Sequence, residues 1–105
     1  MTARERLPNR RASTTLTFQC AGLCYVCTYS RYADGRLGEL FISNQKSNSA
    51  ADRNARDAAI AFSFAVQHGA EPEAIRRALC RDAKGRANGP LGRALGRAGH
   101  ERGKD

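Results

Sequence analysis

Apolar and polar positions alternate along the first half of the chain, which is the pattern of strands with one buried face. Residues 13–20 (STTLTFQC) and 23–32 (LCYVCTYSRY) both show it, and both are rich in β-branched and aromatic side chains. Gly22, between these segments, supplies the positive φ that a tight hairpin turn needs. Residues 33–36 (ADGR) form a second turn before a third strand at 37–43 (LGELFIS). The pattern predicts a three-stranded antiparallel meander.

The apolar spacing then changes to three and four residues, which is typical of a helix. Residues 51–67 carry an alanine-rich apolar side opposite a charged side, which predicts an amphipathic helix. Ser49 or Asp52 caps its start, and Gly69 is its natural left-handed stop. A proline opens a second, short helix at 72–80. The apolar side of the first helix comprises Ala55, Ala58, Ala59, Phe62, Ala65 and Val66.

The chain of 105 residues is therefore expected to hold one α+β domain. Residues 13–80 form it, as a three-stranded antiparallel meander followed by two helices packed on one face, in the order β-β-β-α-α. Residues 1–12 are a basic, extended N-terminal arm. Residues 81–105 mix glycine, arginine and alanine with almost no large apolar residue, so we expect this tail to be mostly disordered.

The positive charge lies at the two ends of the chain. The net charge is +8, and the segment between the arm and the tail is nearly neutral. Flexible basic ends attract phosphates without fixed geometry, so weak, nonspecific nucleic-acid binding is one expectation, and solubility alone is the other. The tail and arm residues that would carry such binding are Arg10, Arg11, Arg86, Arg93 and Arg97.

The stretch CAGLCYVC, residues 20–27, has the C-x3-C-x2-C spacing of a radical SAM cluster motif. A chain of this length cannot form the barrel that usually takes about 200 residues or more. In a hairpin that turns at Gly22, Cys20 and Cys27 share the apolar face with Leu23, whereas Cys24 points to the opposite face. A zinc or iron–sulfur site on the three cysteines remains an alternative, but the hairpin favours Cys20 and Cys27 as small core residues.

The polar loop at 44–49 precedes a helix N-terminus, where backbone donors favour an anion. Lys46, Ser47 and Ser49 are its candidate ligands for a phosphate or nucleotide, although the loop lacks the glycines of a P-loop. An ordinary capped loop is the alternative. His68 beside the helix stop is expected to contact backbone carbonyls. The sequence contains no set of residues typical of enzyme catalysis, so we predict no catalytic residue.

No apolar run approaches the roughly 18 residues of a membrane span. The N-terminus has no apolar segment behind its arginines, unlike a secretory signal. We therefore expect a cytoplasmic protein with reduced cysteines and no membrane contact.

Three stretches together, RERLPNRRAS, ADGRLGELFIS and AIAFSFAVQHGAEPEAI, resemble the TSCPD domain. This domain is known mainly from the C-terminal region of adenosylcobalamin-dependent (class II) ribonucleotide reductases, and also as short standalone proteins. The resemblance runs from about Arg4 to Leu79. Its most specific parts are Arg6-Leu7-Pro8, Asp34-Gly35-Arg36, Gly38-Glu39, Phe41-Ile42, Ser63 and Gln67-His68-Gly69.

The resemblance implies less than the activity of the large enzymes. Their radical cysteine, cobalamin site and nucleotide site belong to a ten-stranded barrel that this chain does not contain. Their redox tail uses a cysteine pair, and this sequence has no cysteine after Cys80. The Thr-Ser-Cys-Pro-Asp ending is also missing, with Cys80-Arg81-Asp82 at best a remnant. No adenosylcobalamin or other cofactor is therefore expected in the isolated chain, and no turnover from it.

The resemblance thus implies a standalone domain in a bacterial cytosol, a noncatalytic accessory or regulatory module related to ribonucleoside-diphosphate reductase and deoxyribonucleotide synthesis. Its partner would be a ribonucleotide reductase or a second copy of the chain. The alternatives are a small basic nucleic-acid-binding protein and a cysteine-based metal or redox module.

Overall fold

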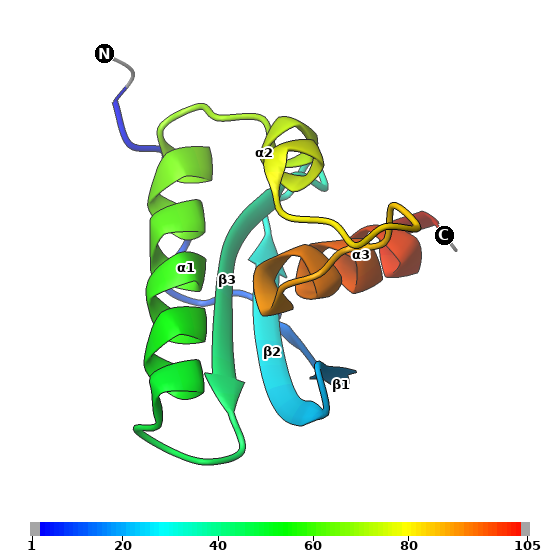
Figure 1. Cartoon of the computed structure of the whole chain (residues 1–105). Helices are drawn as coiled ribbons and strands as arrows, with labels where there is room; N and C mark the ends of the chain where they lie inside the picture. Colours follow the sequence, from blue (N-terminus) through cyan, green and yellow to red (C-terminus); the bar gives the residue numbers. More distant parts are fainter. Residues whose placement is uncertain (1–2, 104–105) are drawn as a thin grey trace.

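The structure, a computed structural model, describes residues 3–103 and the side chains of residues 3–99. Three strands are followed by three helices (Figure 1). Their bounds are β1 (Thr14–Cys20), β2 (Leu23–Arg31), β3 (Leu37–Asn44), α1 (Ala50–Gln67), α2 (Pro72–Ala78) and α3 (Pro90–Gly103). The α+β class and the antiparallel meander are confirmed.

The hairpin of β1 and β2 has the predicted register. Cys20 pairs with Leu23 and Leu16 with Cys27. Ala21 and Gly22 both have positive φ, 53° and 79°, as the two central residues of a type I′ turn require. The second pairing, between β2 and β3, is also antiparallel, with a register shift next to Arg31. The sheet order is β1-β2-β3.

One face of the sheet carries the hydrophobic core. Phe18 of β1, Cys27 of β2 and Leu40 of β3 are buried there. Helix α1 packs Phe62 against this face, and α3 adds Leu95. Leu23 was expected on the same face but is 44 % exposed, because it lies beside the turn at the end of the hairpin. The remaining buried apolar residues of this core are Cys20, Tyr25, Tyr29, Leu37, Ile42, Ala55, Ala59, Val66, Ala94 and Ala98.

Helix α1 also shields the free edge of β3, as Figure 1 shows with the two side by side. The hydroxyl of Ser63 lies 2.9 Å from the N–H of Leu40 and 3.0 Å from its carbonyl. The amide nitrogen of Gln67 donates to the carbonyl of Gly38 at 2.8 Å. These side chains make the hydrogen bonds that a further strand would make with the edge of β3, and so protect the edge from pairing with another chain.

The N-terminal arm, residues 3–12, has no regular secondary structure but is fixed to the domain. The N–H of Glu5 donates to the carbonyl of Gln67 at 2.6 Å. Leu7 packs over Gly38, where an added Cβ would lie 2.7 Å from a methyl carbon of Leu7. Glycine at this position therefore lets the arm approach the start of β3.

The tail differs most from the expectation. Residues 90–103 form helix α3, whose Ala94, Leu95 and Ala98 are buried in the core. Helix α2, in contrast, has no fully buried residue. The second helix that covers the sheet is therefore α3 rather than the helix at 72–80, and the disorder expected for 81–105 is not found over residues 81–103.

Candidate functional site

The outer face of the sheet is open over part of its area. Val26 of β2 and Phe41 of β3 are 38 % and 51 % exposed there, and Ile60 of α1 borders them at 45 %. Together with their neighbours they enclose a shallow hollow of about 530 Å³. We call this surface the open face. It is lined by Val26, Thr28, Phe41, Ile42, Ser43, Arg53, Arg56, Asp57 and Ile60.

Helix α1 supplies the charges at the rim of the open face. Arg53 donates to the carbonyl of Asn48 at 2.7 Å through one nitrogen of its guanidinium group. Arg56 lies 3.9 Å from a carboxylate oxygen of Asp52, and its side chain is 62 % exposed. Asp57 is the single acidic residue of the lining. Two arginines thus border an apolar floor with most of their hydrogen-bonding capacity directed to solvent.

The N-terminal arm covers the other part of the outer face. Arg11 of the arm donates to the carboxylate of Glu39 at 2.6 Å and forms an ion pair with it. Glu39 lies on the opposite face of the strand from its neighbour Leu40, which points into the core. It is nevertheless buried. The arm therefore limits the open face to the half of the sheet near Phe41.

Arg36 joins the arm to the turn before β3. Its guanidinium group binds both carboxylate oxygens of Glu5, at 3.0 and 2.9 Å, and it also contacts Asp34 at 2.7 Å. The guanidinium hydrogen bonds lower the pKa of the Glu5 carboxyl group and raise the pKa of Arg36. The pKa of Asp34 is lowered by the backbone N–H of Arg36, at 3.1 Å, and also by the guanidinium group. Much of the sequence pattern at 34–39 is therefore explained by attachment of the arm.

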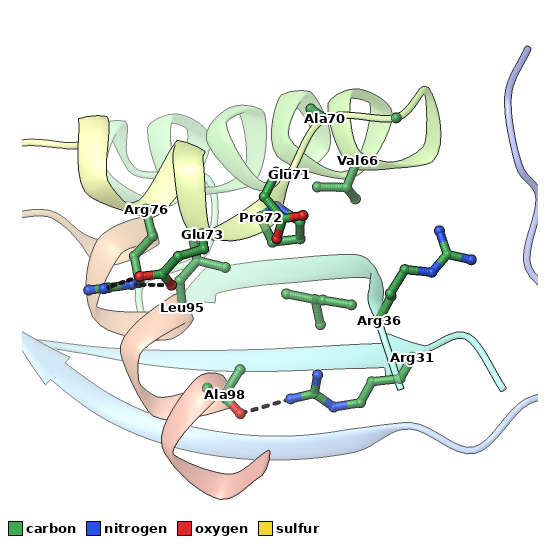
Figure 2. Close-up of a pocket in the computed structure, with 13 residues that line it drawn as sticks. Arg31, Arg36, Val66, Ala70, Glu71, Pro72, Glu73, Arg76, Leu95 and Ala98 are labelled. Carbon is green, nitrogen blue, oxygen red and sulfur yellow. Dashed lines mark hydrogen bonds and ion pairs between the residues drawn. The ribbon is translucent and has the colours of Figure 1, made fainter. Parts of the chain in front are cut away.

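A second, smaller cavity of about 200 Å³ lies between the turn before β3 and the helices α2 and α3 (Figure 2). Arg31 reaches across it to the carbonyl of Ala98 at 2.8 Å. Arg76 and Glu73 pair within it at 2.8 Å, which lowers the pKa of Glu73 to about 2. The volume is below the ~300–1,000 Å³ of usual ligand pockets, and these charges already have partners. We interpret this cavity as structural.

The hairpin separates the three cysteines of residues 20–27. Cys20 and Cys27 are buried on the core face, and Cys24 is exposed. Burial raises the pKa of Cys27 to about 12. Among the described residues, no three His, Cys, Asp or Glu side chains gather in a way that suits a metal ion. The structure thus does not bring Cys20, Cys24 and Cys27 together.

The candidate anion loop is occupied by the protein's own groups. Ser49 is the N-cap of α1, accepting from the N–H of Asp52 at 3.1 Å. The buried carboxylate of Asp52 accepts from the N–H groups of Asn44 and Asn48, at 2.8 and 2.9 Å, and these bonds lower its pKa. Lys46 and Ser47 are exposed. Asp52 therefore takes the backbone donors of the loop that were expected to hold an anion.

The arginines of the arm and tail prove to be partly structural. Arg11 binds Glu39, Arg86 pairs with Asp82 at 3.2 Å, and Arg93 donates to the carbonyl of Ala87 at 2.9 Å. Arg10 and Arg97 are exposed. His68 donates through Nδ1 to the carbonyl of Phe64 at 2.8 Å, which confirms its predicted contact with backbone.

The sequence pattern does not predict the open face. Phe41 is recognisable as a strand residue, but alternation alone does not tell which face of a sheet the helices leave uncovered. The one available signal was the position of Ile60 and Phe64, two large apolar residues outside the apolar side of α1.

Two curated relatives match part of the chain. The vitamin B12-dependent ribonucleotide reductase of Rhodopirellula baltica is 41% identical over 73 residues, which is 69% of this chain and 7% of the relative. The vitamin B12-dependent ribonucleotide reductase of Agrobacterium fabrum is 36% identical over 66 residues, 63% of this chain and 5% of the relative. The chain is thus related to a short segment of these much longer proteins.

The other comparisons add no relatives. No family model matches the chain, and no solved structure matches it. Within residues 3–103, no helix combines the length and apolar character that crossing a membrane requires.

Proposed function

We propose that this protein is a noncatalytic accessory module of ribonucleotide reduction, a TSCPD-type domain that acts on a reductase by binding to it. The observation that carries the proposal is the sequence match, which is confined to a small part of the vitamin B12-dependent reductases. A segment that folds with its own core is a separable module rather than a fragment of a larger catalytic domain.

The chemistry of the described residues supports a binding role. Acid–base or nucleophilic catalysis needs groups held within hydrogen-bond reach of one another around a cleft. At the open face, the hydroxyl of Thr28 lies 3.0 Å from that of Thr15, so its hydrogen-bond partner is another hydroxyl group. Of the cysteines, Cys27 is buried with a raised pKa. These features suit a surface that binds rather than one that reacts.

The resemblance implies adenosylcobalamin as the cofactor of the large reductases. This cofactor does not fit the described part of this chain. The open face is a shallow hollow of about 530 Å³ on a sheet, far too small to enclose a corrin. The ring nitrogen Nδ1 of His68, the histidine whose side chain is described, is already bonded to the carbonyl of Phe64. We therefore assign the cofactor to the partner and derive no step through it.

Binding to a reductase tests the proposal. We expect the purified chain to form a complex with a vitamin B12-dependent reductase from the same cell, detected by sedimentation velocity at moderate salt. The chain alone should give no ribonucleotide turnover, and the mixture should differ from the reductase alone in rate or in its response to nucleotides. Phe62→Ala, which removes a buried core side chain, is the unfolded control.

A folded chain that neither co-sediments with the reductase nor alters its turnover, when present in large excess, would contradict the proposal. Turnover by the chain alone would contradict the noncatalytic part of it.

A further inference from the structure

We propose that the open face binds single-stranded nucleic acid, with a base stacked on Phe41 and the adjoining phosphates held by Arg53 and Arg56. This activity goes beyond the proposed function and does not depend on it. It also differs from attraction by the basic arm and tail, because Arg11 of the arm and Arg86 and Arg93 of the tail have partners within the protein.

Phe41 has the position that base stacking needs. It lies on the outer face of β3, is 51 % exposed, and lines the hollow with Val26 and Ile60 around it. An aromatic ring on an open sheet accepts any unpaired base, because every base has a π-face. Thr28 and Ser43 add hydroxyl groups to the same surface, which can meet the edges of a base.

The arginines are placed for the backbone of the strand. Arg53 and Arg56 stand on α1 beside the hollow, where Arg53 donates to the carbonyl of Asn48 and Arg56 lies near the carboxylate of Asp52. The net charge of +8 attracts a polyanion to the whole molecule. Asp57 opposes a phosphate at the rim, and this makes its removal a useful probe.

Further side chains lie along α1 beyond the open face. Arg53, Ile60 and Phe64 are spaced by seven and four residues, so they lie along one side of the helix. Phe64 is 49 % exposed, and the guanidinium carbon of Arg4 lies 4.7 Å from the centre of its ring. Eleven residues of helix span about 16 Å. Arg4 also donates to the side chain of Gln67 at 2.6 Å. A second aromatic ring and an arginine thus lie beyond the open face, where a strand of several nucleotides would pass.

The size of the surface favours this ligand over a protein. The hollow of about 530 Å³ falls within the ~300–1,000 Å³ of pockets for small molecules and single bases. A stable protein interface usually involves about 20–30 residues on each side, and nine residues line this one. The arm, which attaches through Glu39, prevents the open face from extending over the whole sheet.

Fluorescence anisotropy with labelled oligothymidylate and oligouridylate of about 15 nucleotides tests the proposal. We expect both to bind, with an affinity that falls as salt increases. Phe41→Leu keeps an apolar side chain but removes stacking, and should weaken binding at least about fivefold. Arg53→Gln with Arg56→Gln should reduce the salt slope by about 1.4, which is two contacts at ~0.7 each. Asp57→Asn should strengthen binding.

The matched control is Arg86→Gln with Arg97→Gln, which removes two charges away from the open face and should leave most of the affinity. Thymidine monophosphate should compete poorly, because it offers one base and one phosphate. The fold of every variant is checked by circular dichroism and by its thermal midpoint. Because Phe41 is exposed, we expect Phe41→Leu to fold like the parent.

Several results would overturn the proposal. They are equal affinity of Phe41→Leu and the parent, an equal loss in the control pair, and duplex DNA bound as tightly as single strands. A concentration-dependent dimer that Phe41→Leu dissociates would show that a second copy of the chain occupies the open face instead. Binding of a protein partner that Phe41→Leu abolishes would likewise assign the face to that partner.

Discussion

Cys27 shows how position in the hairpin decides the chemistry of a side chain. It is fully buried, and burial raises the pKa of its thiol to about 12, so the reactive thiolate is almost absent at neutral pH. Cys20 is also buried, whereas Cys24 and Cys80 are exposed. The spacing that suggests a cluster therefore divides into two core residues and one surface residue.

Thiol labelling checks this division. In the folded protein we expect an aromatic disulfide reagent to modify Cys24 and Cys80 rapidly, and to reach Cys20 and Cys27 only after denaturant is added. Cys24→Ser should remove half of the rapid phase and leave the protein folded. Rapid labelling of all four thiols under native conditions would show that the core face has been misassigned.

Asp52 links the loop before α1 to the pH dependence of stability. Because backbone hydrogen bonds lower its pKa from the usual 3.8, its carboxylate stabilises the fold at neutral pH, and that stabilisation is lost as the pH falls below about 4. Asp52→Asn should lower the thermal midpoint at pH 7 and flatten the fall in midpoint between neutral and acid pH. A variant with the pH profile of the parent would contradict this role.

At the scale of elements, α1 stabilises β3 through its edge as well as its face. Ser63→Ala should remove the partner of both the N–H and the carbonyl of Leu40. Leaving buried backbone groups unpaired costs about 1–3 kcal/mol, which denaturant titration would measure. Ser47→Ala, in the exposed loop, should leave the free energy of unfolding unchanged. Equal values for the two variants would mean that the edge is not shielded by α1.

Helix α3 gives a second prediction at this scale. Leu95→Ala should lower the free energy of unfolding by about 2–5 kcal/mol, because it removes a buried core side chain. Arg97→Ala on the exposed side of the same helix is the control and should be nearly neutral. If Leu95→Ala were also neutral, α3 would not be part of the folded domain.

The elements differ in how far the sequence predicts them. Alternation on both sides of Ala21-Gly22 fixes the register of the hairpin, and three- and four-residue spacing with Ser49 and Gly69 fixes α1. Residue spacing does not predict helix α3, because its glycines lower the helix propensity of the segment. In the structure Gly92 is instead buried in contact with Ala87, so packing that no local pattern reports outweighs propensity.

The open face escapes prediction for a related reason. Residues of β3 alternate as in any half-buried strand, and the sequence does not reveal that the arm covers the part near Glu39 while Phe41 stays exposed. Side chains far apart in the chain, Val26, Phe41 and Ile60, meet only in the folded molecule.

At the scale of the whole molecule, arm, sheet and helices form one unit, and 63–69% of the chain matches a small part of much longer proteins. The arm is attached to both α1 and the start of β3. Its attachment covers one part of the outer face of the sheet and leaves the open face exposed.

Exchange of the matching segment tests the central proposal, that this chain is a ribonucleotide reductase module, most directly. Turnover would be measured for a vitamin B12-dependent reductase, for the same enzyme without the matching segment, and for a chimera that carries this chain in its place. We predict that deletion lowers turnover or its nucleotide response and that the chimera restores it, whereas a chimera with Phe62→Ala does not. A folded chimera no better than the deletion, or a deletion without effect, would contradict the account.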